Sequence, residues 1–258
     1  MGDDGTMTPL LEIKNLTKNY NDGPNSRDIL KDLNLQVNEG DFLTILGPSG
    51  CGKTTLIRCI AGFEDYQGDI LVEGKKVSTP GIDRFMVFQT FDQLFPWKTV
   101  RNNIVYPLKV NGITDKAELD RIVDEHLDMV GLSGKGDLYP HQLSGGMKQR
   151  VAIAKGLALK PKIILMDEPF AALDAMTRNK LQKELVSLQE REHATVIFIT
   201  HNIQEALVLG TRVILMSKTG HIKINMDNSI ERPVTPASPG YGELWKTLNQ
   251  ALWEEDDE

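Results

Sequence analysis

The chain has 258 residues, of which 40% are hydrophobic and 25% are charged, and its formal net charge is -7. This composition is that of a globular domain with a buried core, and its negative balance argues against a protein whose main work is to bind nucleic acid. No stretch approaches the roughly 20 apolar residues that a membrane-spanning helix needs, and residues 1–8 lack the basic and apolar segments of a secretory leader. The two cysteines, Cys51 and Cys59, have no CxxC or His cluster beside them, so we expect buried thiols rather than zinc ligands or a disulfide.

Short apolar runs separated by helical patterns predict a sheet of mostly parallel strands. Residues 33–37 alternate apolar and polar side chains, which predicts a half-buried strand that closes in a turn at residues 38–40. The run from Phe42 to Leu46 is almost wholly apolar, as expected for a strand buried on both faces. Similar runs recur at residues 163–166, 196–199 and 213–216. We therefore expect an α/β fold in which strands and helices alternate.

The strand that ends at Leu46 is followed by a segment that fits the phosphate-binding pattern G-x-x-x-x-G-K-[ST]. Its residues are Gly47, Pro48, Ser49, Gly50, Cys51, Gly52, Lys53 and Thr54. Glycines let backbone N–H groups curl around phosphate oxygens, and a helix that begins near Lys53 would present its positive end to the same anion. We expect Lys53 to reach the β- and γ-phosphates and the Thr54 hydroxyl to coordinate Mg²⁺, with Thr55 beside it in the nucleotide site.

Residues 90–159 carry helical patterns and few strand signals, so we expect a helical subdomain inserted into the sheet domain. Its clearest helix has apolar residues at helical spacing and a glycine suited to end it. These residues are Leu119, Ile122, Val123, Leu127, Val130 and the terminal Gly131.

The apolar run at residues 163–166 leads into two acids, Asp167 and Glu168. Strand alternation predicts that the two side chains point to opposite sides and do different work. We assign Asp167 to the Mg²⁺ shell and Glu168 to polarising the water that attacks the γ-phosphate. The carboxyl end of a parallel strand is also where doubly wound sheets hold their ligands.

Residues 143–150 read LSGGMKQR, and with this segment the sequence resembles the ABC ATPase family, whose signature usually reads LSGGQ. Ser144, Gly145 and Gly146 open a predicted helix and so form a second N-terminal anion site. Met147 departs from the usual Gln. The resemblance implies a P-loop NTPase (RecA-like) core of mostly parallel strands, with N-terminal antiparallel β strands and the inserted helical subdomain.

The resemblance also implies roles for residues that would carry little information alone. Gln89 occupies the Q-loop position, which links Mg²⁺ and the γ-phosphate to the helical subdomain, and residues 172–174 resemble the D-loop, so Asp174 joins the nucleotide site. His201 matches the switch histidine that contacts the γ-phosphate, and Tyr20 falls where the family stacks a ring on adenine. Asn202 stands where the family usually has Asp, which puts the orientation of His201 in question.

Two copies of the chain are expected to pack head to tail, because the resemblance implies that each signature closes on the ATP held by the other copy's P-loop. The expected ligands are ATP and Mg²⁺. The expected partners are a second copy, integral membrane permease subunits and, indirectly, a substrate-binding protein, with no nucleic acid. The resemblance places such a subunit peripherally on the cytoplasmic face of the cell membrane.

A loop rich in aromatic residues, 91–97, is a candidate docking surface for the permease, although the same rings could instead pack the helical subdomain. The segment 94–100, followed by Asn103 and Ile104, resembles bacterial importers of the nitrate, sulfonate and taurine group. The run GGMKQRVAIAK at residues 145–155 resembles the same group. Three alternatives stay open: a soluble ABC ATPase that acts on nucleic acid or ribosomes, a non-hydrolysing regulatory subunit, and an exporter.

Residues 1–232 are expected to form the ATPase domain, and residues 233–258 a linker and a C-terminal amphipathic helix with an acidic tail. Three prolines between residues 233 and 239 predict the linker. Leu244, Leu248 and Leu252 repeat every four residues and predict a helix that packs on the body of the protein. A contact with a partner is the other interpretation.

Overall fold

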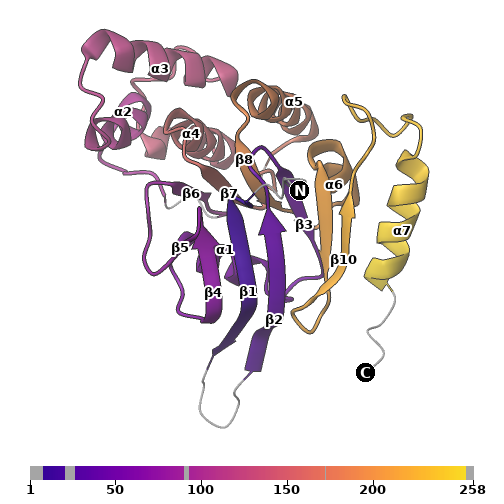
Figure 1. Ribbon diagram of the computed structural model, residues 1–258. Helices are drawn as coiled ribbons and strands as arrows, with labels where there is room; N and C mark the ends of the chain where they lie inside the picture. The colour runs from indigo at the N-terminus through magenta and orange to yellow at the C-terminus, as the bar shows by residue number, and fades with distance from the viewer. Residues whose placement is uncertain (1–7, 21–26, 90–92, 172, 254–258) are drawn as a thin grey trace, which may run out of the picture.

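The computed structural model describes residues 8–20, 27–89, 93–171 and 173–253, and its central element is a six-stranded sheet (Figure 1). Its strands, in spatial order, are β10 (Ile222–Asp227), β9 (Arg212–Met216), β3 (Phe42–Leu46), β8 (Thr195–Ile199), β7 (Ile163–Asp167) and β6 (Arg84–Val87). The strands β9, β3, β8, β7 and β6 run parallel, and β10 pairs antiparallel with β9. The predicted class and the parallel sheet are confirmed.

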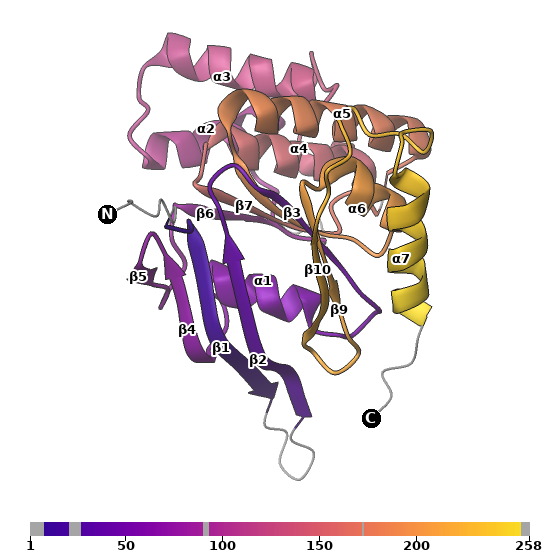
Figure 2. The ribbon, with the colours of Figure 1, turned by 45° about the vertical axis from the view of Figure 1, so that its right-hand side comes forward.

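A second, antiparallel sheet comes mainly from the N-terminal part of the chain. Its strands, in spatial order, are β2 (Arg27–Val37), β1 (Leu11–Tyr20), β4 (Gln67–Val72) and β5 (Lys75–Lys76). Helix α1 (Lys53–Ala61) lies between the two sheets, as Figure 2 shows, and its apolar side packs into the core that they share. The strand predicted at residues 33–37 begins earlier, at Arg27, because pairing with β1 extends it beyond its alternating segment.

Helices cover the other face of the large sheet. Helices α4 (Gly145–Ala158), α5 (Ala175–Glu192) and α6 (Ile203–Leu209) lie on it, with a short 3₁₀ turn, η2 (Pro140–Gln142), before α4. Helices α2 (Val100–Val110) and α3 (Lys116–Met129) pack on α4 in turn. In β7, Ile163 and Leu165 face the α1 side, whereas Ile164 and Met166 face the α4 and α5 side. Burial on both faces explains why these strands are continuous apolar runs in the sequence.

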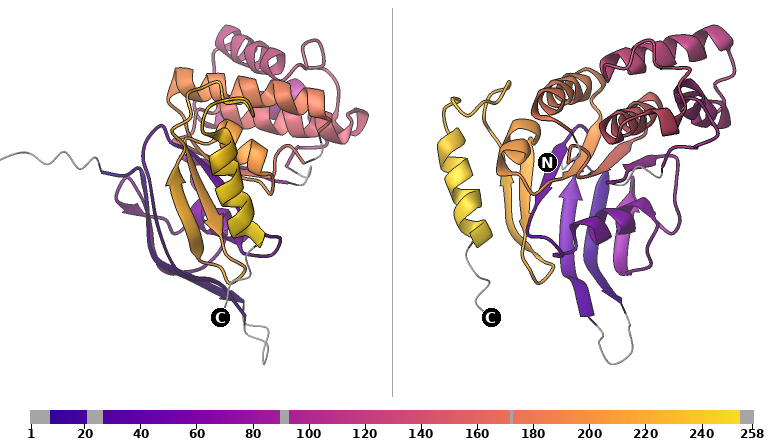
Figure 3. Two further views of the ribbon diagram at one scale, coloured as in Figure 1. Left: turned by 90° about the vertical axis from the view of Figure 1, so that its right-hand side faces the viewer. Right: turned by 180° about the vertical axis from the view of Figure 1, so that it is seen from behind.

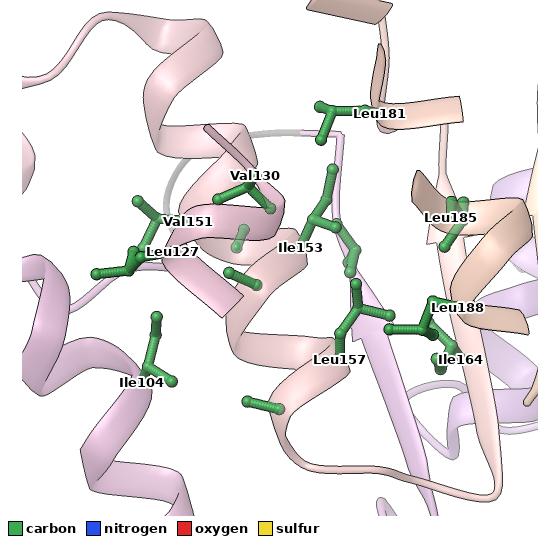
Figure 4. Packing of buried hydrophobic residues seen from close by; sticks show 14 of the residues in the cluster. Ile104, Leu127, Val130, Val151, Ile153, Leu157, Ile164, Leu181, Leu185 and Leu188 are labelled. Carbon is green, nitrogen blue, oxygen red and sulfur yellow. The ribbon is translucent and has the colours of Figure 1, made fainter. Parts of the chain in front are cut away.

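Helix α4 lies at the centre of the helical region and joins it to the sheet (Figure 4). Val151 faces Leu127 of α3, while Leu157 approaches Ile164 of β7. The helical region therefore shares one continuous core with the sheet. The predicted end of α3 is confirmed, because Gly131 has a φ of 65° and its N–H bonds to the carbonyl of Asp128.

The C-terminal helix α7 (Tyr241–Trp253) packs against α6 and the β9–β10 edge, far from α2 and α3 (Figure 3). Leu248 is fully buried there. The predicted linker is partly packed as well, since Val234 is buried in the same cluster. The acidic residues 254–258 lie outside the described part of the chain. Among the described residues, none of the helices has the length and apolar character to cross a membrane.

Replacing Leu248 with Ala should lower the free energy of unfolding by about 2–4 kcal/mol, because a fully buried leucine leaves a cavity. The matched control is Trp253→Ala, which removes a larger side chain of the same helix that is 77% exposed and should change stability by about 0.5 kcal/mol or less. Urea denaturation of the full chain measures both. Equal effects of the two substitutions would show that α7 does not depend on the buried face.

Candidate active site at the carboxyl ends of the parallel strands

The phosphate-binding segment forms the connection between β3 and α1. Gly52 precedes the first residue of α1 and has a φ of 99°, in the left-handed region that favours glycine. A Cβ on Gly52 would lie 2.8 Å from Leu30 and 2.9 Å from the carbonyl oxygen of Ile29, so β2 also requires a glycine there. The loop therefore leads directly into the N-terminus of α1, where the first backbone N–H groups of a helix lack partners within the helix, as an anion site needs.

Lys53 begins α1, as predicted, and its side chain turns back into the loop. Its Nζ donates to the carbonyl oxygens of Gly47 at 2.8 Å and Pro48 at 2.9 Å. The residue is only 6% exposed. These bonds hold a positive charge inside the curve of the phosphate-binding segment, where a phosphate oxygen would meet it.

Thr54 and Asp167 form the second part of the site. The Thr54 hydroxyl donates to the Asp167 carboxylate at 3.2 Å, although the two residues are 113 positions apart in the chain. Asp167 is 4% exposed, and this burial raises the pKa of its carboxyl above the ordinary value. A hydroxyl, a carboxylate and the nearby Gln89 amide are oxygen ligands of the kind that Mg²⁺ prefers, with room left for phosphate oxygens. The residues therefore fit a magnesium ion.

Glu168 and His201 form the third part. The Glu168 carboxylate lies 3.0 Å from Nδ1 of His201. The prediction that strand alternation separates Asp167 from Glu168 is wrong in its reason. β7 ends at Asp167, and Glu168 has a φ of 44°, with its N–H bonded to the carbonyl of Ile199. A left-handed residue redirects the chain, and this turns Glu168 toward the phosphate-binding segment.

These parts surround one open pocket of about 520 Å³. It is lined by Ile29, Ser49, Gly50, Gly52, Lys53, Thr54, Thr55, Gln89, Glu168 and His201. The structure thus brings together most of the predicted phosphate-binding, metal-binding and catalytic side chains. Gly47, Pro48, Cys51 and Asp167 do not line the pocket, although Asp167 contacts Thr54, which does. Ile29 was not predicted; the apolar pair at residues 29 and 30 was the signal in the sequence. A larger cavity of about 630 Å³ lies at the other end of the parallel strands, near the starts of β7 and β8, and none of the phosphate-binding segment lines it.

Other predicted residues do not line this pocket. Tyr20 ends β1, 39% exposed, with the Lys18 ammonium 4.8 Å from its ring centroid. Ser144 caps α4 by accepting from the N–H of Met147, with Gly145 and Gly146 in the first turn of that helix. Ser144, Gly145 and Gly146, like Tyr20, are absent from the lining of their own chain's pocket.

Asp174 and Asn202 each cap a helix. Asp174 caps α5 by accepting from the N–H of Thr177 at 2.9 Å and does not line the pocket, and Ala172 of the same predicted loop lies outside the described residues. Asn202 caps α6 by accepting from the N–H groups of Gln204 and Glu205. Asn and Asp cap helices about equally well, so the substitution keeps the helix start after His201 intact.

Comparison with known proteins identifies the family of this fold and pocket. A family model described as ABC transporter matches residues 30–171. The chain is 48% identical to an uncharacterized ABC transporter ATP-binding protein of Methanocaldococcus jannaschii, over 95% of this chain and 92% of that protein. It is 39% identical to an aliphatic sulfonates import ATP-binding protein, SsuB, of Bacillus cereus, over 93% of this chain and 94% of that protein. It is also 43% identical to a bicarbonate transport ATP-binding protein, CmpC, of Synechococcus elongatus, over 88% of this chain but only 35% of that longer protein.

The structure is also similar to a solved ATP-binding cassette, MJ0796. That protein is a dimer in a post-hydrolysis state, bound to ADP and Pi. It superposes with a TM-score of 0.77 and 34% sequence identity, over 84% of this chain and 98% of that chain.

Replacing Asp167 with Asn should stabilise the nucleotide-free protein at pH 7 by on the order of 1 kcal/mol, because it removes a buried negative charge. The raised pKa sets the sign: the folded state holds the proton more tightly, so stability falls as pH rises from the ordinary aspartate pKa through the raised one. The gain should therefore disappear below about pH 3.9, where the carboxyl is neutral in both states. Thermal unfolding as a function of pH measures it.

With Mg²⁺ and ATP added, wild type should become more stable than the Asp167→Asn variant. Wild type gains stability by binding the complex, whereas Asp167→Asn keeps the hydrogen bond to Thr54 but loses the charged ligand. A variant that is no more stable than wild type at pH 7, or that gains as much from Mg²⁺ and ATP, would contradict this description of Asp167.

Proposed function

The chain belongs to the ABC transporter family of ATP-binding proteins and is an ATPase, and we propose that two copies of it power a membrane importer of a small anion. The observation that carries the proposal is the pocket in which the Glu168–His201 pair faces Lys53 and Thr54 of the phosphate-binding segment. The names of the relatives support import as the use of this hydrolysis.

ATP binding falls to the phosphate-binding segment and the residues next to it. Backbone N–H groups of residues 47–52 and the positive end of α1 receive the phosphates, and the Lys53 ammonium binds the β- and γ-phosphates. Thr54, Asp167 and Gln89 would hold Mg²⁺, which supplies positive charge opposite the phosphate oxygens when it is bound. Tyr20 would meet the adenine as a stacking surface.

Hydrolysis requires a water in line with the γ-phosphate. Glu168 accepts the proton of that water as it attacks. His201, whose Nδ1 lies 3.0 Å from the Glu168 carboxylate, orients that carboxylate and contacts the γ-phosphate. The left-handed backbone at Glu168 fixes the carboxylate at the pocket, so the base is in place before nucleotide binds.

Pairing explains the second anion site. Ser144, Gly145 and Gly146 open α4 but do not line their own chain's pocket. In a head-to-tail dimer with two-fold symmetry, each α4 N-terminus would close on the γ-phosphate held by the other copy, and Asp174 would lie at the same interface. The dimeric state of the similar ATP-binding cassette supports this arrangement. Two triphosphates would hold the dimer closed until hydrolysis releases it.

The permease would dock on the aromatic surface formed by Phe95, Trp97 and Tyr106. The Phe95 ring centroid lies 5.6 Å from that of Trp97 and 5.2 Å from that of Tyr106. Trp97 is 69% exposed and Tyr106 is 45% exposed, so these rings remain accessible to a partner rather than buried in the helical region. Large exposed rings held by neighbours are typical of interface anchors. The chain would then sit peripherally on the cytoplasmic face of the membrane.

The cargo class is a small anion such as nitrate, bicarbonate, taurine or another sulfonate. The resemblance of residues 94–104 and 145–155 to importers of this group supports it, and so do the names of the sulfonate and bicarbonate relatives. A separate substrate-binding protein would choose among these anions.

The test measures uptake of labelled nitrate, bicarbonate and taurine by cells that carry chromosomal variants of the chain. Lys53→Ala should abolish uptake of one of these anions and lower the ATPase rate of the purified chain by about 100-fold or more. Trp97→Ala should lower the uptake achieved per ATP hydrolysed. Trp253→Ala is the matched control, since it removes an exposed tryptophan ring from α7, which lies far from the helical region.

Cells with Lys53→Ala that take up all three anions at wild-type rates would contradict the importer function. Equal uptake per ATP hydrolysed in the Trp97→Ala and Trp253→Ala cells would leave the ATPase assignment intact but contradict the proposed docking surface.

A further inference from the structure

A buried charged network adjoins the Glu168–His201 pair and takes no part in the mechanism above. Its centre is Glu205 in the first turn of α6, which is 9% exposed. The Thr200 hydroxyl donates to one Glu205 oxygen at 2.6 Å. The Gln182 amide reaches the other oxygen at 3.5 Å, and Arg178 Nε lies 3.6 Å from it. A carboxylate this deeply buried is costly unless such partners surround it.

The network holds the backbone on both sides of His201. Thr200 precedes His201 and is 2% exposed. Its hydroxyl donates to Glu205 and accepts from the N–H of Asn202, the residue after His201, at 3.0 Å. One hydroxyl therefore ties the two neighbours of His201 to a fixed carboxylate. The direction of the His201 ring depends on this short segment.

Arg178 joins the same network to the loop before α5. One guanidinium nitrogen donates to the carbonyl oxygen of Leu173 at 3.1 Å, while Nε faces Glu205 at 3.6 Å. That Nε atom is buried and, within the described residues, has no hydrogen-bond partner. A shift of a few tenths of an ångström toward Glu205 would complete the bond. Leu173 precedes Asp174, which the dimer proposal places at the interface.

A small cavity of about 70 Å³ connects the network to the catalytic pair. Its lining includes Glu168 and His201 of the pair, and Arg178, Thr200 and Glu205 of the network. The charged cluster and the hydrolytic pair thus line the same small cavity, so the two groups of side chains are direct neighbours.

We propose that Glu205 is a positioning residue for hydrolysis. Through Thr200 it holds the backbone on both sides of His201. Through Arg178 it couples the position of that backbone to the position of the loop at Leu173. Contact with the second copy at Asp174 would move Leu173 and Arg178 together, close the 3.6 Å gap to Glu205 and fix His201 for turnover. This inference rests on the proposed roles of His201 and of the dimer.

The test compares, in the full chain, substitutions at Thr200, which directly follows β8, and at Thr195, the first residue of β8. Thr200→Val removes the hydroxyl with little change of shape, and we expect kcat for ATP to fall about tenfold or more while KM changes less than about twofold. Thr200→Ser restores the hydroxyl and should recover kcat to within about threefold of wild type. Thr195→Val is the matched control, because it removes a buried hydroxyl that accepts from the Gly40 N–H at the far end of the same strand. It should lower the melting temperature without lowering kcat.

A double-mutant cycle tests the link to Arg178. Arg178→Lys keeps the charge but loses the planar group that contacts Leu173 and Glu205 together. If both residues act through one network, the double variant with Thr200→Val should lose little more kcat than the more impaired single variant.

Each outcome has one meaning. A Thr200→Val variant with wild-type kcat, a Thr200→Ser variant as slow as Thr200→Val, or fully multiplicative losses in the cycle would each overturn the inference while wild-type hydrolysis stands. A wild-type chain without ATPase activity would overturn the proposed function instead.

Discussion

The parallel alignment of β3, β8, β7 and β6 is the constraint on which the rest of the structure depends. Parallel strands place all their carboxyl ends at one edge of the sheet. The phosphate-binding segment, His201, Glu168 and Gln89 follow these four strands, so segments far apart in the chain converge on one pocket. The alignment holds only because both faces of the strands are apolar and covered, by α1 on one side and by α4 and α5 on the other.

Helix α4 connects its first residues, Ser144, Gly145 and Gly146, to the edge of this pocket. It begins at the signature segment, and its Gln149 amide donates to the carbonyl oxygen of Phe88, just before Gln89, at 3.1 Å. One turn and a half further on, Lys155 donates to the carbonyl oxygen of Gln93 at 3.1 Å. Its ammonium also lies 4.9 Å from the Phe95 ring centroid, in the proposed docking surface. A movement of α4 would therefore reach the residues beside the nucleotide pocket and the proposed docking surface together.

The predictable part of this protein is the part in which local sequence and tertiary burial agree. Strands buried on both faces leave continuous apolar runs, and the phosphate-binding pattern located Lys53 and Thr54 because its glycines and its helix start are set locally. The orientation of Glu168 was predicted for the wrong reason, since strand alternation cannot anticipate a left-handed residue. Arg178 and Glu205 were missed because charged residues in the first turns of helices are usually solvated. Only the packing of α5 against α6 buries Glu205 and the Nε atom of Arg178 side by side.

The oligomeric state of Glu168→Gln with ATP and Mg²⁺, measured by light scattering together with its ATPase rate, tests the shared nucleotide sites most directly. The variant keeps the shape of the side chain but cannot accept the proton of the attacking water. We expect a stable dimer that forms only with ATP, and an ATPase rate at most about a hundredth of that of wild type. A variant that stays monomeric at saturating ATP would contradict the proposal that two copies share each nucleotide. A variant that hydrolyses ATP at the wild-type rate would contradict the role of Glu168.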